Sequence, residues 1–133
     1  MIFVDTGPFI ARYVKRDQYH KAAKEYWERL VEERRLYTSN FVLGEVFTYL
    51  GRVAGAAFAA ERGKYIYASS RLNILRPKAE HEISALGWMS KFSDQQVSFT
   101  DCVSFALMTE RGIDRVFTFD RHFVLAGFER WPR

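Results

Sequence analysis

The chain has 133 residues, of which 48% are hydrophobic and 27% are charged. This composition is typical of a globular protein, and the length suffices for a buried core, so we expect one domain over residues 1–133. The formal net charge of +4 is compatible with a nucleic-acid partner, and equally with a basic protein that binds none. The single cysteine, Cys102, excludes an internal disulfide framework.

The sequence shows no signal for export or membrane insertion. The N-terminus lacks a basic segment followed by an apolar one. No apolar run reaches the roughly 20 residues that span a bilayer. We therefore expect a cytoplasmic protein without a membrane partner.

Short apolar runs alternate with segments of helical periodicity along the chain. The short runs predict strands at residues 2–4, 36–39, 72–75, 116–119 and, at an edge, 128–131. Apolar residues spaced three to four apart predict helices at 9–14, 19–33, 41–52, 54–69, 78–92 and 98–111. This order predicts an α/β fold: a three-layer α/β/α sandwich with a central four- or five-stranded parallel sheet.

Two acids follow predicted strands directly. Asp5 comes after Ile2-Phe3-Val4, and Asp120 comes after Val116-Phe117-Thr118-Phe119. Ligands of open α/β sheets bind beyond the carboxyl ends of the strands, so both carboxylates are candidates for a site there. The alternative is that each aspartate merely caps the following helix.

Two further acids lie in predicted helices. Glu45 is the only charged residue in an otherwise apolar helix before Arg52. A carboxylate in such a place must be protonated, paired or bound to a cation, and an ion pair with a buried base is the alternative. Asp101 stands three residues after Ser98, which is the spacing of a capping box, so it can cap its helix, face the site, or do both.

Four acids at one edge of a sheet would repel one another unless a cation were bound. Carboxylates without His or Cys suit Mg²⁺ or Mn²⁺. Such ions support hydrolysis of phosphodiesters, because they activate water and stabilise the leaving oxygen. We therefore expect Asp5 and Asp101 to be the principal metal ligands, Glu45 to bind directly or through water, and Asp120 to act through a water or a second ion.

Small polar residues adjoin the acids and can orient carboxylates or water, or simply cap helices: Thr6, Asn40, Thr100 and Thr118. Basic residues near the predicted site are candidates for contacts with a nucleic-acid backbone, or for an ordinary solvated face: Arg12, Lys15, Arg16 and Arg121. The histidines have no metal-ligand spacing and are interpreted as surface or packing residues: His20, His81 and His122.

In their order and spacing, four segments resemble a PIN-domain ribonuclease, in particular the VapC-type toxins of prokaryotic toxin–antitoxin pairs: residues 2–6, Asn40 with Glu45, 98–102 and 117–123. The resemblance implies an α/β/α sandwich whose acids, Asp5, Glu45, Asp101 and Asp120, converge on Mg²⁺ or Mn²⁺. It also implies endonucleolytic cleavage of RNA, a homodimer, and inhibition by a cognate VapB-like antitoxin.

Three other functions are considered. A housekeeping RNA-processing nuclease of the same fold would lack an antitoxin. A binding module would hold RNA without cutting it. Asp5-Thr6-Gly7 also matches the motif of aspartic proteases, but their fold is nearly all β and this chain is predicted to be mostly helical.

Overall fold

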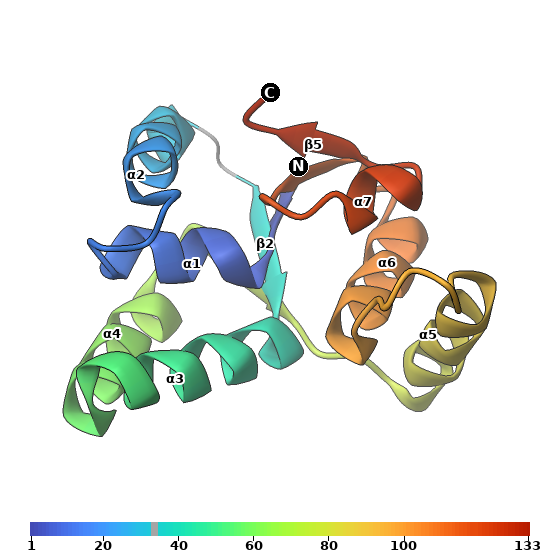
Figure 1. Ribbon diagram of the computed structural model, residues 1–133, viewed down its shortest axis with the longest axis horizontal. Coiled ribbons are helices and arrows are strands. Elements are labelled where there is room, and N and C mark those ends of the chain that lie inside the picture. The colour runs from blue at the N-terminus through green and yellow to red at the C-terminus, as the bar shows by residue number, and fades with distance from the viewer. Residues whose placement is uncertain (33–34) are drawn as a thin grey trace.

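Five parallel strands form the centre of the molecule in the computed structural model, which describes residues 1–32 and 35–133 (Figure 1). Within those residues the strands are β1 (Ile2–Val4), β2 (Leu36–Ser39), β3 (Leu72–Leu75), β4 (Arg115–Phe117) and β5 (Glu129–Trp131). Their order across the sheet is β3-β2-β1-β4-β5, and every neighbouring pair is parallel. The predicted parallel sheet is therefore confirmed, with five strands.

Helices cover both faces of this sheet. The first four are α1 (Thr6–Tyr13), α2 (His20–Arg29), α3 (Asn40–Ala54) and α4 (Ala56–Ala68), and a 3₁₀ turn at Leu30–Glu32 follows α2. The others are α5 (Ala79–Lys91), α6 (Phe99–Arg111) and the short α7 (His122–Leu125). Figure 1 shows α1 to α4 on one side of the sheet and α5 to α7 on the other. This arrangement is the predicted α/β/α sandwich, and it excludes the nearly all-β fold of aspartic proteases.

The strand order creates a switch point between β1 and β4. The chain builds the sheet outward from β1 to β3, then crosses the other face and returns beside β1 as β4. Phe3 pairs with Val116 and Val4 with Phe117, and the Asp5 N–H donates to the Phe117 carbonyl oxygen over 3.0 Å. The residues that follow β1 and β4 therefore lie side by side, in the crevice where such sheets bind ligands.

The core explains why these strands are apolar without alternation. Ile2, Phe3 and Val4 of β1 are all fully buried, because helices cover both faces of the central strand. Helix α6 packs an almost continuous buried run, Asp101 to Met108, against the sheet. Gly112 ends α6 with a positive φ of 67°, a backbone conformation that glycine adopts without strain.

Several predicted boundaries were wrong. Helix α1 begins at Thr6, three residues earlier than predicted, and Pro8 is its third residue. Proline is tolerated there because no N–H in the first turn has an intrahelical partner. Ser39, not Asn40, caps α3, since the Ser39 hydroxyl accepts from the Val42 N–H. The predicted helix 19–33 corresponds to α2 and the 3₁₀ turn that follows it. Its predicted last residue, 33, lies outside the described residues.

Strand β4 ends at Phe117, two residues earlier than predicted, and the four-residue helix α7 was not predicted because it is too short to show a period. No helix in the described ranges is both long enough and apolar enough to span a membrane.

Candidate active site

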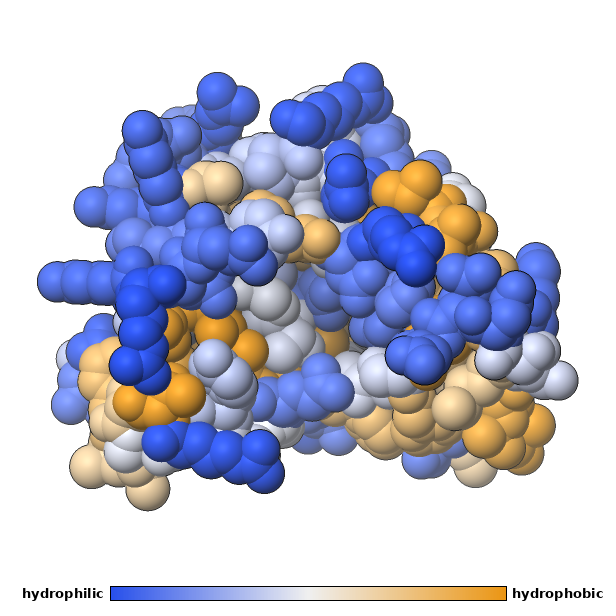
Figure 2. Space-filling view, viewed as in Figure 1, coloured by the Kyte–Doolittle hydropathy of each residue, from blue (hydrophilic) through white to orange (hydrophobic). Residues whose placement is uncertain are grey.

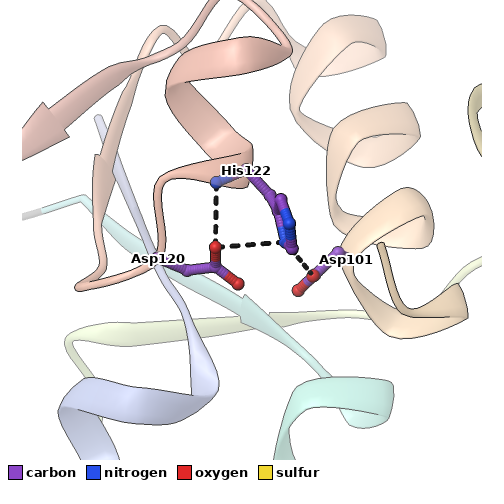
Figure 3. Close-up of side chains that lie close together, drawn as sticks. All are labelled: Asp101, Asp120 and His122. Carbon is purple, nitrogen blue, oxygen red and sulfur yellow. Dashed lines mark hydrogen bonds and ion pairs between the residues drawn. The ribbon is translucent and has the colours of Figure 1, made fainter. Parts of the chain in front are cut away.

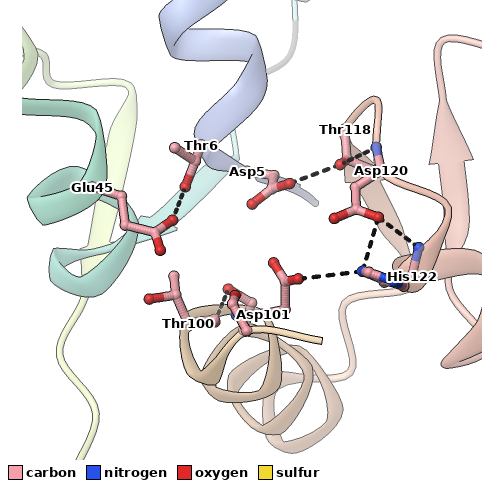
Figure 4. A network of polar contacts seen from close by, with 10 residues as sticks. Asp5, Thr6, Glu45, Thr100, Asp101, Thr118, Asp120 and His122 are labelled. Atoms are coloured by element: carbon pink, nitrogen blue, oxygen red, sulfur yellow. Dashed lines mark hydrogen bonds and ion pairs between the residues drawn. The ribbon is translucent and has the colours of Figure 1, made fainter. Parts of the chain in front are cut away.

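A cavity of about 910 Å³ opens at the carboxyl end of the strands. Its lining includes five acids. One of them, Asp17, lies in the loop between α1 and α2. The other four come from different parts of the fold: Asp5 after β1, Glu45 on α3, Asp101 on α6, and Asp120 after β4. Figure 4 shows these four side chains pointing toward one another. The structure therefore brings together the four acids that the sequence singled out.

Asp5 stands at the N-cap position of α1, but its side chain makes no capping hydrogen bond. The capping alternative is therefore excluded for this residue. Its carboxylate instead accepts a hydrogen bond of 2.8 Å from the Thr118 hydroxyl, and the residue is only 6% exposed. A buried carboxylate aimed into a cavity is expensive unless something there favours its charge.

Thr118 connects the ends of β1 and β4. Its hydroxyl donates to Asp5 and accepts from the Asp120 N–H over 3.0 Å. Asp120 in turn accepts a 2.8 Å hydrogen bond from the His122 N–H, which starts α7. One threonine therefore fixes the relative positions of two of the four acids.

Asp101 both caps α6 and faces the cavity. The Ser98 hydroxyl accepts from the Asp101 N–H over 3.0 Å, so the backbone of Asp101 serves the helix cap. Its carboxylate is left to line the cavity, and it is buried. The two interpretations that the sequence left open for Asp101 are both realised.

Glu45 lies in a different environment from the one predicted. The sequence indicated a carboxylate inside an apolar helix, whereas Glu45 is exposed on α3 at the rim of the cavity. Its nearest partner is Thr6, whose hydroxyl donates to the Glu45 carboxylate over 2.8 Å. Glu45 thus needs no buried ion pair, because water reaches it.

Burial and mutual repulsion disturb the two innermost acids. Loss of solvation, followed by the charge of Asp101, raises the pKa of Asp5 from 3.8 to about 7. Loss of solvation, followed by the charge of Asp120, raises the pKa of Asp101 to about 6. A bound cation would reverse both effects, since it favours the ionised carboxylates.

His122 is the residue that sequence reasoning missed. It was interpreted as a surface or packing residue, but its Nδ1 lies 3.1 Å from Asp120 Oδ1 and 3.6 Å from Asp101 Oδ2 (Figure 3). The signal in the sequence was its position two residues after Asp120. In the structure the turn between them brings the side chains of Asp120 and His122 together. The packing interpretation does hold for His81, which is buried and bonded to Lys78 and Glu110.

The other sequence candidates divide into two groups. Thr6, Thr118 and Arg121 lie at the site, through contacts with the acids or in the lining of the cavity. Four others do not line the cavity: Asn40, Arg12, Lys15 and Arg16. Contact of the three basic residues with an RNA backbone outside the cavity stays a prediction. The guanidinium of Arg12 stacks over Trp27. Arg130 of β5 lines the cavity and was not singled out.

The donor set fits a hard divalent cation. Asp101, Asp120 and His122 each offer an atom within 4.8 Å of the other two. The neighbouring charges that act on Asp5 are those of Asp101 and Asp120, and both repel it. Oxygen-rich sites of this kind suit Mg²⁺ or Mn²⁺, and one imidazole nitrogen is compatible with Mn²⁺.

In EDTA, the melting temperature of the protein is expected to fall as the pH rises from 5 to 7.5. Asp5 and Asp101 keep their protons in the folded state up to pKa values of about 7 and about 6, but lose them near 3.8 when unfolded, so the folded state binds more protons across this window. At pH 7.5, Asp5→Asn should be more stable than the wild type by about 1–3 kcal/mol. A wild-type stability that rises over the window would contradict this.

Thr118→Val should weaken Mn²⁺ binding about tenfold, as loss of a group that orients a metal ligand commonly does. Valine keeps the shape but neither donates to Asp5 nor accepts from the Asp120 N–H. Thr118→Ser keeps the hydroxyl and is the matched control. Calorimetric titration measures both affinities, and equal binding by the valine and serine variants would show that the hydroxyl has no such role.

Comparison with known proteins agrees with this geometry. The family model for the PIN domain matches residues 2–129. The chain is 36% identical over 128 residues to the 23S rRNA-specific endonuclease VapC20 of Mycobacterium tuberculosis, covering 96% of this chain and 95% of that protein.

Solved structures give the same result. The crystal structure of M. tuberculosis VapC20, described as a sarcin–ricin loop cleaving toxin, matches with a TM-score of 0.87 and 34% identity over 96% of both chains. VapBC2 from Rickettsia felis, bound to a DNA fragment from its promoter, matches with a TM-score of 0.73 at 13% identity, over 98% of this chain and 97% of that one. The latter likeness shows the fold alone. The resemblance found in the sequence is confirmed, and the chain belongs to the PIN-domain family.

Proposed function

We propose that this protein is an endoribonuclease that hydrolyses RNA phosphodiester bonds with Mg²⁺ or Mn²⁺. The observation that carries the proposal is the convergence of Asp5, Glu45, Asp101 and Asp120 on one cavity at the switch point of the sheet. PIN nucleases use divalent metal ions, and the acidic cluster supports the proposal that one binds here. Residues 1–133 would act as one domain.

Each residue has a distinct task in this scheme. Asp5 and Asp101 would hold the cation, with Asp120 and Glu45 completing the site directly or through water. When bound, the cation activates water and stabilises the leaving oxygen. Thr118 holds the Asp5 carboxylate, Ser98 holds the backbone of Asp101, and Thr6 holds Glu45. The carboxylates are thus oriented before substrate arrives, which is the main contribution that a protein makes to such a site.

We further propose that the protein acts in the cytoplasm as the toxin of a VapBC-type pair, inhibited by a VapB-like antitoxin. The identity of 36% to VapC20 over almost the whole of both chains supports this. Because VapC20 is named for 23S rRNA, ribosomal RNA is the first substrate to test. A housekeeping nuclease would instead be tolerated by cells without any antitoxin.

The basic residues are proposed contacts for the RNA backbone. Arg121 lines the acidic cavity. Arg12 and Lys15 border a smaller cavity of about 470 Å³ beside α1 and α2, and Arg16 is exposed in the loop between these two helices. Such contacts would make binding weaken as salt rises.

A homodimer is proposed through the α3–α4 hairpin. An apolar cavity of about 620 Å³ lies there, lined by Lys64 and otherwise by small and aromatic residues: Phe47, Gly51, Ala56, Ala59, Ala60, Gly63 and Tyr67. Figure 2 shows apolar surface gathered over this hairpin, at the lower left. Small residues allow the backbones of two helices to approach closely, and exposed apolar surface of this kind marks interfaces.

Asp5→Asn and Asp101→Asn should each reduce the rate of cleavage of a mixed RNA pool, with ribosomal RNA included, by at least about 100-fold. The wild type should cut with Mg²⁺ or Mn²⁺ and not in EDTA. The reason is that each change removes a carboxylate from the cation site while keeping the shape of the side chain.

Asp94→Asn is the matched control, because Asp94 is an exposed loop acid outside the cavity. It should cut like the wild type. If Asp5→Asn cut RNA at the wild-type rate, the catalytic assignment would fail. If folded wild-type protein bound RNA but never cut it with either metal, the non-catalytic binding module would be the better account.

Ala60→Arg should convert the dimer to a monomer, because it places a charge in the apolar cavity of the α3–α4 hairpin. Ala57→Arg, an exposed position of α4 that does not line this cavity, should leave the dimer intact. Light scattering after gel filtration measures both masses. Equal masses for the two variants would place the interface elsewhere.

A further inference from the structure

Two aromatic rings stand at the mouth of the acidic cavity. Tyr19 and Phe119 stack face to face, with ring centroids 4.4 Å apart and an angle of 4° between their planes. Both line the cavity that holds the four acids. Tyr19 is nevertheless 40% exposed, so the stack offers aromatic surface at the rim of the cavity.

The pair is held in place by its surroundings. The Tyr19 N–H donates to Asp17 Oδ1 over 2.8 Å, and the ring of the next residue, His20, lies 2.7 Å from the Ala11 carbonyl oxygen through its Nδ1. Phe119 packs edge-on against the buried Phe117, with centroids 6.0 Å apart. Rings that are already fixed lose little conformational entropy when a ligand binds.

The stack adjoins the acids themselves. Phe119 directly precedes Asp120 in the chain. The Phe119 ring also covers Gly7, two residues after Asp5, so closely that a methyl group there would lie 3.8 Å from its Cδ2 atom. A group that rested on these rings would therefore lie beside the loops that carry Asp5 and Asp120.

The charges around the cavity indicate which part of a ligand can rest on the two rings. The carboxylates of the cavity repel phosphate, so backbone charge alone is a poor source of affinity close to them. A flat, uncharged nucleobase has a π-face that stacks on tyrosine and phenylalanine whatever its sequence. Arg121 and Arg130, both exposed, line the same cavity and suit the phosphates that flank such a base.

We propose that the Tyr19–Phe119 stack is a platform for one unpaired nucleobase next to the scissile phosphate. The inference rests on the proposed nuclease function and adds a binding surface to it: two aromatic rings that hold a base beside the cut. A base inside a duplex has both faces covered by its neighbours and cannot reach a protein ring. Tyr19 is then a positioning residue, since it places the phosphate without touching the reacting atoms.

The test uses full-length protein carrying Asp5→Asn, so that RNA is bound and not cut. The probe is a 12-nucleotide single-stranded RNA with 2-aminopurine at its centre, whose fluorescence is quenched when the base stacks on an aromatic ring. We expect quenching on binding. Adding Tyr19→Leu should weaken binding about tenfold and remove most of the quenching, whereas Tyr19→Phe should stay within about twofold.

Two controls separate stacking from charge and from general loss of structure. Tyr65→Ala removes an exposed tyrosine of α4 that does not line this cavity, and it should change neither affinity nor quenching. Tyr19→Leu should leave the slope of log affinity against log salt unchanged, whereas Arg121→Ala should reduce that slope by about 0.7, the value for one phosphate contact on a single strand.

Three results would overturn the platform. The first is that the Asp5→Asn parent protein does not quench the probe. The second is that adding Tyr19→Leu changes neither affinity nor quenching, and the third is that a duplex containing the probe binds as tightly as the single strand. The nuclease proposal is tested separately by metal-dependent cutting. Cutting without quenching overturns the platform alone. Quenching that depends on Tyr19 without cutting overturns the nuclease and leaves the stack as a site that binds a base without placing a phosphate for cleavage.

Discussion

The constraint on which this structure depends is the mutual repulsion of carboxylates held close together, partly out of water. Burial alone disfavours the charge on Asp5 and Asp101, and each charge disfavours the others. The surrounding protein opposes this only in part, through the Thr118 hydroxyl, the Ser98 cap and the nearby His122. We infer that a bound positive ion would relieve the remaining repulsion, and a site of that kind is also suited to chemistry on phosphates.

The topology explains how four short, ordinary segments reach one point. Two acids follow β1 and β4, which are neighbours only because the chain reverses its direction of sheet growth between them. Asp101 arrives at the first turn of α6, the helix that leads into β4, and Glu45 on α3, the helix that leaves β2. None of the four needs an unusual backbone, since the parallel sheet points all their elements toward one edge.

Much of this could be predicted from the sequence. The alternation of short apolar runs and helical periods gives the sheet and its layers, because a buried parallel strand such as Ile2–Val4 has no polar face. Asp5 and Asp120 could be named because the carboxyl ends of parallel strands meet at the edge where α/β sheets bind ligands. Glu45 and Asp101 could be named from their positions in predicted helices. The environment of Glu45 could not be predicted, since the apolar residues around it in sequence turn toward the core while Glu45 turns toward water.

The residues that join the site only through tertiary contacts could not be predicted from the sequence either. His122 and Arg130 join the cavity through the turn before α7 and through the edge strand β5, and neither element has a strong pattern of its own. The pairing of Tyr19 with Phe119 links residues 100 positions apart in the chain. Such contacts follow from how the loops meet above the sheet, which periodicity does not describe.

The central claim is that a divalent cation holds the acidic cluster together, and thermal unfolding against Mn²⁺ concentration at pH 7.5 tests it most directly. The wild type should begin at a lower melting temperature than an Asp5→Asn, Asp101→Asn double variant in EDTA, and its melting temperature should rise steadily with Mn²⁺ as the bound ion stabilises the folded state. The double variant should not respond. An equal response of both proteins, or none from the wild type, would contradict the account.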